Sequence, residues 1–495
     1  MHKPLHPVVW PALFLVFLGS LLMTEPKSVR AASPAGSSAA APAVAPPAPL
    51  APVPTPRQLA WQEREFIAFA HFGVNTFTDR EWGDGKEDPA VFNPTALDAR
   101  QWARTCKDAG MKMLILTAKH HDGFCLWPSR YTEHSVKSSP WRGGKGDVVR
   151  EAADACREAG IDFGVYLSPW DRHEPCYGDS PKYNEYYMNQ LAELLTNYGR
   201  VCEVWFDGAG SKNQAYDFPA YWALVRKLQP DACMFSDCGP DVRWVGNEKG
   251  YAADPNWATI YTGRMRFGQR NPDQTHGVEG GPDWAATEAD VSIRPGWFYH
   301  PGEDGKVKTL KELLDIYYAS VGQNAVLLLN VPPDRRGLMH ENDASRLREF
   351  RAAIDASFSV DLARGKAATA SNVRGRSPAF EAARAVDGDK ATYWATDDGV
   401  TAASLEVDLG AGTAFNRVMI QEHIALGQRV KAFVVEGWDG QAWKELGRGQ
   451  TIGYKRILRF ATVTAAKVRL RIEDARACPT ISNFGLFLAP ATLEK

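Results

Sequence analysis

Short apolar runs alternate with helical stretches from about residue 61 to 358, and this alternation most constrains the fold of the chain. Six runs have the length and composition of buried strands: 67–74, 113–117, 163–168, 202–207, 234–237 and 325–331. Helical spacing is found between them, at 97–109, 148–159, 183–198, 218–228 and 310–321. The pattern predicts an α/β fold with parallel strands. Because no G-x-G-x-x-G follows the first strand, a (β/α)8 TIM-like barrel over residues 57–358 is favoured over a dinucleotide-binding sheet.

The hydrophobic pattern of the sequence changes after about residue 360. Apolar and polar residues alternate with period two at 405–409, 418–421, 433–436 and 468–472, and Trp438-Asp-Gly440 has the composition of a hairpin turn. Residues 361–491 are therefore expected to form a separate all-β antiparallel sandwich.

The N-terminal segment has the features of an export signal. A short basic start precedes an apolar stretch over residues 8–23 and small residues near position 33, so residues 1–33 are interpreted as a signal peptide, with an uncleaved anchor as the alternative. Residues 34–56 are almost entirely Ala, Pro and Ser, which predicts a disordered or polyproline-like linker. We expect a periplasmic or secreted protein that is free of the membrane after cleavage.

Charge and cysteine usage exclude several classes of protein. The 57 basic and 59 acidic residues give a formal net charge of -2, which offers no electrostatic basis for binding nucleic acid or an anionic membrane. The eight cysteines contain no C-x-x-C pair, so free thiols are expected, and one or two disulfides are permitted without any pairing being assigned. The partner is therefore expected to be a neutral molecule.

Histidines, tryptophans and carboxylates follow successive predicted strands. In a barrel these positions meet at the C-terminal ends of the strands, where active sites lie. They are His71 and Glu81-Trp82, then Lys119-His-His-Asp122, Ser168-Pro-Trp170-Asp171 and Trp205-Phe-Asp-Gly208. This set suits a glycosidase, which needs two carboxylates, hydrogen-bonding groups and an aromatic surface for the sugar. Asp207 is placed to be the ionised carboxylate, with a helix N-cap as the alternative interpretation.

His120, His121 and Asp122 have a rival interpretation as metal ligands. Adjacent side chains at a strand end point to opposite faces, so both histidines could bind one ion only if the chain bends. Hydrogen bonding to sugar hydroxyls is favoured over a metal and over a purely structural role.

Taken together, these motifs resemble the α-L-fucosidases of glycoside hydrolase family 29 over about residues 57–355. The resemblance rests on Ala70-His-Phe-Gly73, Glu81-Trp82, Ala118-Lys-His-His-Asp-Gly-Phe124, Val204-Trp-Phe-Asp-Gly208, Ser292-Ile-Arg-Pro-Gly-Trp-Phe-Tyr299 and Leu328-Leu-Asn-Val-Pro-Pro-Asp334. It implies that Asp207 is the nucleophile. It also implies that the fucose is held by His71, Glu81, Trp82, His120, His121, Tyr166 and Trp205.

The general acid/base differs between branches of that family. Glu248 resembles the acid/base of the branch that cleaves α-1,3 and α-1,4 fucosyl linkages, and Glu288 is its rival. Arg243 lies close enough in sequence to Glu248 to reach the sugar. The implied reaction is retaining exo-hydrolysis of a terminal fucose through a covalent fucosyl-Asp intermediate, without any cofactor or active-site metal.

The C-terminal motifs Ala385-Val-Asp-Gly-Asp-Lys-Ala-Thr-Tyr-Trp394 and Asn483-Phe-Gly-Leu-Phe487 resemble discoidin-like (coagulation factor 5/8 C-type) domains. The resemblance implies a carbohydrate-binding module and a structural calcium near Asp387, Asp389 and Thr392, whose oxygens are suitable ligands. Whether this domain binds glycan or only supports the barrel stays open, as does the oligomeric state.

Two other functions compete with a fucosidase acting on fucosylated oligosaccharides or glycoconjugates. A catalytically silent glycan-binding or adhesion protein could use the barrel as a scaffold, but the presence of both Asp207 and Glu248 argues against it. A retaining barrel glycosidase for another sugar is disfavoured by the set of histidines.

Overall fold

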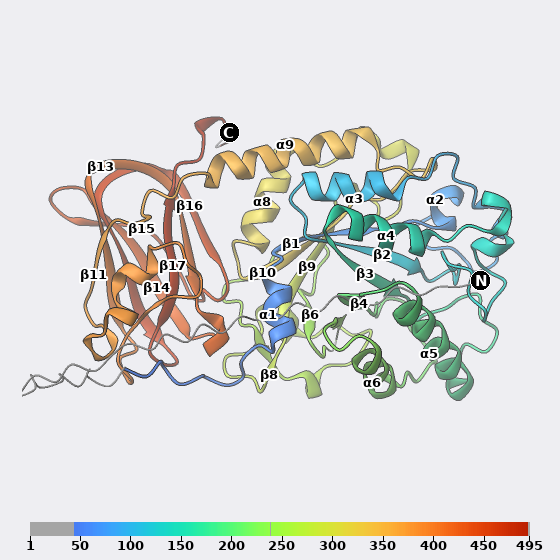
Figure 1. Cartoon of the computed structure of the whole chain (residues 1–495), viewed down its shortest axis with the longest axis horizontal. Helices are drawn as coiled ribbons and strands as arrows, with labels where there is room; N and C mark the ends of the chain where they lie inside the picture. Colours follow the sequence, from blue (N-terminus) through green and yellow to red (C-terminus); the bar gives the residue numbers. More distant parts are fainter. Residues whose placement is uncertain (1–43, 238, 494–495) are drawn as a thin grey trace, which may run out of the picture. The chain divides into compact units, whose positions relative to one another are not determined.

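The structure is a computed structural model that describes residues 44–237 and 239–493. Eight parallel strands close into a barrel, in the order β1-β10-β9-β6-β5-β4-β3-β2 (Figure 1). They are β1 (Phe66–Ala70), β2 (Met113–Lys119), β3 (Asp162–Leu167), β4 (Glu203–Trp205), β5 (Cys233–Ser236), β6 (Val242–Trp244), β9 (Ala286–Ser292) and β10 (Ala325–Asn330). The predicted (β/α)8 barrel is thus confirmed.

Helices precede, connect and follow the barrel strands along the chain. They are α1 (Pro56–Gln62), α2 (Val74–Thr78), α3 (Ala99–Asp108), α4 (Val148–Ala159), α5 (Ser180–Asn197), α6 (Phe218–Leu228), α7 (Pro272–His276), α8 (Leu310–Ser320) and α9 (Glu341–Phe358). Side-chain caps set several of the boundaries: Asp147 accepts the amide of Arg150 at the start of α4, and Gly160 ends that helix with φ +72°. A two-stranded ribbon, β7 (Thr259–Ile260) with β8 (Asp283–Trp284), interrupts the pattern between β6 and β9.

Alternation along each strand separates two apolar layers. Ile67 and Phe69 on β1 pack in the barrel interior, whereas Phe66, Ala68 and Ala70 join the layer formed with the helices. At the end of β4, Trp205 faces the barrel interior, and Phe206, the residue directly after the strand, faces outward and meets the ring of Phe218 at 5.9 Å. The last residues of each strand are thereby aimed either at the barrel axis or at the helices.

Two barrel strands do not follow the expected apolar pattern. β6 is only three residues long, and β9 reads Ala-Thr-Glu-Ala-Asp-Val-Ser, so neither gives an apolar run. Ala289 and Val291 pack in separate apolar clusters, while Glu288 and Asp290 are buried acidic residues of the same strand. Glu288, the rival candidate for the acid/base, is therefore a buried residue of a barrel strand.

The C-terminal part is an antiparallel sheet domain, as predicted (Figure 1). Its strands are β11 (Ala367–Ala370), β12 (Trp394–Ala395), β13 (Ala403–Glu422), β14 (Val430–Trp438), β15 (Trp443–Gly449), β16 (Arg456–Ala475) and β17 (Thr480–Phe487), in the order β12-β17-β13-β16-β14-β15 with β11 on β13. Hydrogen bonds join this domain to loops that precede barrel strands: Asn324 accepts from the amide of Tyr454 at 2.8 Å, and Glu65 binds Lys455. The domain thus meets the barrel at the N-terminal ends of its strands.

The N-terminal predictions fall partly outside the described residues. This holds for the signal peptide at 1–33 and for 34–43 of the linker. Residues 44–55 are extended and irregular, but they are attached to the C-terminal antiparallel sheet domain (the β-domain). Leu50 donates its amide to the carbonyl of Leu426 at 2.9 Å, and Arg429 donates to the carbonyl of Ala48 at 2.6 Å. The described part of the linker is therefore not a free spacer.

Within 44–237 and 239–493, no helix is long and apolar enough to cross a membrane. The seven cysteines in these ranges are free thiols.

Candidate active site

A cavity of about 260 Å³ lies at the C-terminal ends of the barrel strands. Residues from at least six of the loops that follow the strands contribute to it, as expected of a barrel active site. Its polar and aromatic lining consists of Phe69, His71, Glu81, Trp82, His120, His121, Trp205, Asp207, Phe235, Asp237, Trp244, Glu248, Gln269, Arg270, Asp290 and Trp297. The sequence-predicted residues that the structure brings together here are thus the three histidines, Glu81, Trp82, Trp205, Asp207 and Glu248.

Asp207 is held in one position by its neighbours. Its Oδ2 accepts the hydroxyl of Tyr166 at 3.0 Å and lies 3.6 Å from His121 Nε2, while Oδ1 accepts the amide of Ala209 at 2.8 Å. Burial raises the pKa of Asp207, against the opposing effect of the Ala209 and Tyr166 hydrogen bonds. Its side chain keeps 23% of its surface exposed, so the carboxylate is oriented and still accessible from the cavity.

Tyr166 serves the site indirectly. The ring is fully buried and does not line the cavity, and its hydroxyl donates a hydrogen bond to Asp207. The ring stacks with Trp205 at 5.6 Å, and Trp205 stacks in turn on Phe235 at 3.9 Å. These rings form an aromatic support below the carboxylate.

The histidines are neutral hydrogen-bonding groups. Burial lowers the pKa values of His71 and His121 to about 3 and that of His120 well below its ordinary value. The Asn330 amide group donates to Ser292 Oγ and to the carbonyl of Trp297, so its Oδ1 accepts from His71 Nδ1 at 2.9 Å. The proton of His71 therefore sits on Nδ1, which leaves Nε2 as an acceptor for a hydroxyl group.

Glu81 is bonded to the loop after β9. Its two oxygens accept the amides of Trp297 at 2.9 Å and Phe298 at 3.1 Å, and Oε1 also lies 2.6 Å from His300 Nε2. Burial opposes protonation of His300, but its hydrogen bonds to Glu81 and Asp79 together raise its pKa. Trp82, half of whose surface is exposed, meets the ring of His121 edge-on at 5.4 Å.

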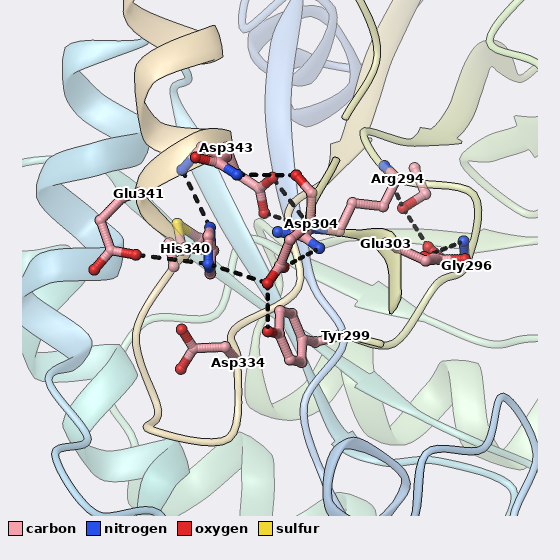
Figure 2. Close-up of polar contacts among 12 residues, drawn as sticks. Arg294, Gly296, Tyr299, Glu303, Asp304, Asp334, His340, Glu341 and Asp343 are labelled. Carbon is pink, nitrogen blue, oxygen red and sulfur yellow. Dashed lines mark hydrogen bonds and ion pairs between the residues drawn. The ribbon is translucent and has the colours of Figure 1, made fainter. Parts of the chain in front are cut away.

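A buried polar cluster anchors this loop to α9 (Figure 2). The guanidinium of Arg294 donates to both oxygens of Asp343, at 3.1 and 2.8 Å, and to Asp304 at 2.9 Å. It also lies 4.9 Å from the centre of the Tyr299 ring, and Glu303 accepts the amide of Gly296 at 3.1 Å. The cluster fixes both ends of the segment that presents Trp297 to the cavity.

The two candidate acids occupy different environments. Glu248 is exposed and lines the cavity. Glu288 is fully buried in the barrel interior, where its Oε1 accepts the indole N–H of Trp205 at 2.7 Å. Burial and the neighbouring Glu203 raise its pKa well above the ordinary value. Of the two, only Glu248 is placed to meet a substrate.

The prediction that Arg243 reaches the sugar is wrong. Val242 on β6 faces the barrel interior, so its neighbour points to the other side. The Arg243 guanidinium donates to the carbonyls of Gln274 at 3.0 Å and Ala285 at 2.5 Å and to Asn256 Oδ1 at 2.7 Å. It is a buried structural residue that ties the α7 segment to the barrel.

Two cavity carboxylates were missed by the sequence reasoning. Asp237 directly follows β5 and accepts the amide of Gly268 at 2.9 Å; burial and the charge of Asp207 raise its pKa to about 7. Asp290, on β9, accepts the indole N–H of Trp244 at 2.8 Å, and burial together with the charges of Glu248 and Asp207 raises its pKa. The position of Asp237 after a predicted strand was a usable signal, whereas Asp290 lies in the strand that the apolar pattern did not show.

No group of three or more His, Cys, Asp and Glu side chains suited to a metal ion occurs within residues 44–237 and 239–493. Asp122 accepts from Asn75 at 3.0 Å and from the amide of Phe124 at 2.8 Å, so it is bonded within the loop. In the β-domain, Thr392 donates to Asp387 Oδ2 at 2.7 Å, while Asp389 caps the amide of Ala391 at 2.9 Å. The three residues expected to hold calcium thus lie together in one loop, and part of their bonding capacity is used within it.

The fold and the cavity together define a barrel glycosidase, with carboxylates, neutral histidines and aromatic rings around one small pocket. The model of the alpha-L-fucosidase family matches residues 55–354, and a model described as a NedA-like, galactose-binding domain matches 384–470. The chain belongs to the α-L-fucosidases of glycoside hydrolase family 29, with a C-terminal discoidin-like domain.

Relatives match along most of the chain. Alpha-L-fucosidase 1 of Arabidopsis thaliana is 46% identical over 89% of this chain and 88% of its own length. A fucosidase of Ruminococcus gnavus solved in complex with fucose is 37% identical, with a TM-score of 0.85 over 92% of this chain and 98% of its own. A glycoside hydrolase 29 member from a rumen bacterium is 43% identical, with a TM-score of 0.79 over 89% and 78% of the two chains.

Proposed function

We propose that this α-L-fucosidase is an exo-acting, retaining enzyme that removes terminal fucose from α-1,3 and α-1,4 linkages of oligosaccharides or glycoconjugates. Asp207 is the nucleophile and Glu248 the general acid/base. The observation that carries the proposal is the placement of these two carboxylates in one cavity, with Asp207 oriented by Tyr166 and Ala209.

The reaction follows from this placement. Asp207 attacks the anomeric carbon while Glu248 gives its proton to the departing glycosidic oxygen, which forms a fucosyl-Asp ester and an alcohol. Glu248 then takes a proton from water, whose oxygen attacks the anomeric carbon and releases Asp207 and fucose with the original configuration. This mechanism requires carboxyl groups about 5 to 5.5 Å apart when substrate is bound.

The other groups of the cavity support binding of a single terminal sugar. The neutral His71 offers a hydrogen-bond acceptor, and Trp82 and Trp297 offer apolar surfaces for the faces of a pyranose ring. A cavity of about 260 Å³ holds one monosaccharide, which favours action at chain ends.

Replacement of the nucleophile tests the proposal. We expect Asp207→Ala to lower kcat by several orders of magnitude without loss of the folded state, because the fucosyl ester cannot form. Azide should restore part of the rate and give a fucosyl azide of inverted configuration. Near-normal turnover by this variant would remove Asp207 from the mechanism, and the competing function, a silent glycan-binding scaffold, requires that the parent protein release no fucose at all.

The acid/base and the linkage are tested separately. With Glu248→Ala, an aryl fucoside with a good leaving group should lose far less rate in the first step than a trisaccharide, since only the poor leaving group needs the proton. For linkage, Lewis a and Lewis x trisaccharides should be cleaved faster than an aryl fucoside by the parent enzyme. Faster cleavage of the aryl fucoside would contradict the α-1,3/1,4 preference.

We further propose that the protein is exported to the periplasm or the medium. For the β-domain we propose carbohydrate binding and a structural calcium at Asp387, Asp389 and Thr392. The oxygen-rich loop and the match to a galactose-binding domain support these roles. Binding of galactosides to the full chain, measured in the presence of fucose to fill the barrel, tests the first role.

A further inference from the structure

A second hollow, of about 630 Å³, opens beside the cavity around Asp207, which is the fucose cavity of the proposed function. It is lined by Asn247, Glu248, Lys249, Tyr251 and Arg270. Glu248 and Arg270 line the fucose cavity as well, so the two spaces are adjacent. If Glu248 protonates the leaving oxygen, as the proposed function holds, the departing part of the substrate lies on this side.

Two cations line the hollow, Lys249 and Arg270, and within residues 44–237 and 239–493 neither side chain has a carboxylate partner. Lys249 and Arg270 are exposed, and neither side chain makes an ion pair or a hydrogen bond to any residue in the described part of the chain. The guanidinium of Arg270 lies 5.5 Å from the ring centre of Trp244, which limits its orientations. Asn247 fixes the neighbouring loop by accepting the amide of Lys249 at 3.0 Å and donating to the carbonyl of Tyr251 at 2.9 Å.

The charge of the hollow depends on the step of the reaction. Glu248 is the one carboxylate among its five lining residues. It must carry a proton when the substrate binds, before it gives that proton to the leaving oxygen, and in this state the lining has two positive charges and no negative one. Tyr251, which is 45% exposed, adds an aromatic face against which a sugar ring can pack.

We propose that this hollow is an aglycone subsite that selects an anionic sugar, one bearing a sulfate or a carboxylate, through Lys249 and Arg270. A pair of cations beside a protonated acid attracts such a group, and the oxygens of a carboxylate or sulfate can accept hydrogen bonds from the guanidinium of Arg270. Neutral aglycones would bind through Tyr251 alone and forgo this attraction.

The test compares neutral, 3′-sulfated and 3′-sialylated Lewis a as substrates. We expect a higher kcat/KM for at least one anionic form, and we expect Lys249→Gln or Arg270→Gln to lower the anionic-to-neutral ratio about twofold to fivefold, the effect of losing one exposed charge contact. Arg264→Gln is the matched control: Arg264 is an exposed cation of the same loop that lies over Tyr261 and lines neither space, so its ratio should equal that of the parent. Salt raised from about 0.01 to about 1 M should reduce the ratio.

A binding measurement separates this proposal from the catalytic one. Calorimetric titration of Asp207→Ala with the same three trisaccharides gives the affinity ratio without any turnover. A preference for the anionic forms that Lys249→Gln removes supports the subsite even if the parent enzyme cleaves none of them, whereas equal or weaker binding of both anionic forms overturns it. A preference for only the sulfated or only the sialylated form identifies the group recognised.

Discussion

Replacement of Arg294 by methionine tests whether the buried cluster behind the active-site loop is needed for its order. Arg294 is completely buried, its hydrogen bonds to both oxygens of the fully buried Asp343 neutralise that carboxylate, and a third bond reaches Asp304 (Figure 2). Methionine keeps much of the volume but leaves the Asp343 carboxylate without a cation. Removing one partner of a buried ion pair costs about 3–5 kcal/mol. We therefore expect the free energy of unfolding of the barrel to fall by about this amount.

Urea denaturation followed by tryptophan fluorescence measures the global change, and hydrogen exchange of the Trp297 and Phe298 amides, which bind Glu81, reports the loop itself. Lys311→Met is the matched control, since the Lys311–Asp315 pair is exposed and such pairs contribute about 0–1 kcal/mol.

The double variant Arg294→Met/Asp343→Leu sharpens the test. It removes both buried charges, so it should be more stable than Arg294→Met alone. A single variant as stable as Lys311→Met, or a double variant with no recovery, would refute the view that Arg294 acts by neutralising Asp343.

The remaining predictions concern the two candidate acids, the pKa of Glu203, the proposed calcium site and the N-terminus. Glu288→Gln keeps an acceptor for the indole of Trp205 and should lose less than about tenfold in kcat. Glu248→Gln should lose about 10²–10⁴-fold in kcat on a trisaccharide, and the reverse order of the two losses would make Glu288 the acid/base. Burial raises the pKa of Glu203 to about 7. The contribution of this group to the free energy of unfolding is therefore fully present below about pH 4.5 and is lost as the pH rises through 7. In Glu203→Gln the thermal midpoint should vary less over this range, and an unchanged pH profile would contradict the raised pKa. Chelation by EDTA should lower the melting temperature of the β-domain and calcium should restore it, unless the loop at Asp387 holds no ion. Mass spectrometry of the exported protein should find a new N-terminus near residue 34, and an intact residue 1 would favour the uncleaved anchor.

The sequence allowed the barrel to be predicted because six of its strands are continuous apolar runs. It failed at β6 and β9, where the strand is very short or carries Glu288 and Asp290 toward the interior. Acidic residues inside a strand give no hydrophobic signal, and they are tolerated here because Trp205 and Trp244 donate hydrogen bonds to them. Local pattern therefore cannot reveal a strand whose polar groups are satisfied by residues far away in the chain.

By itself, the sequence determined the fold class, the two-domain order and the position of Asp207 directly after a buried strand. Tertiary structure alone decided which neighbours complete the site: it placed Glu248 in the cavity, buried Glu288 beneath Trp205, turned Arg243 away and added Asp237 and Asp290. The physical reason is that strand alternation and loop paths fix the direction of each side chain. A residue type and its spacing indicate the chemistry that is available, but the packing of the barrel decides which groups meet.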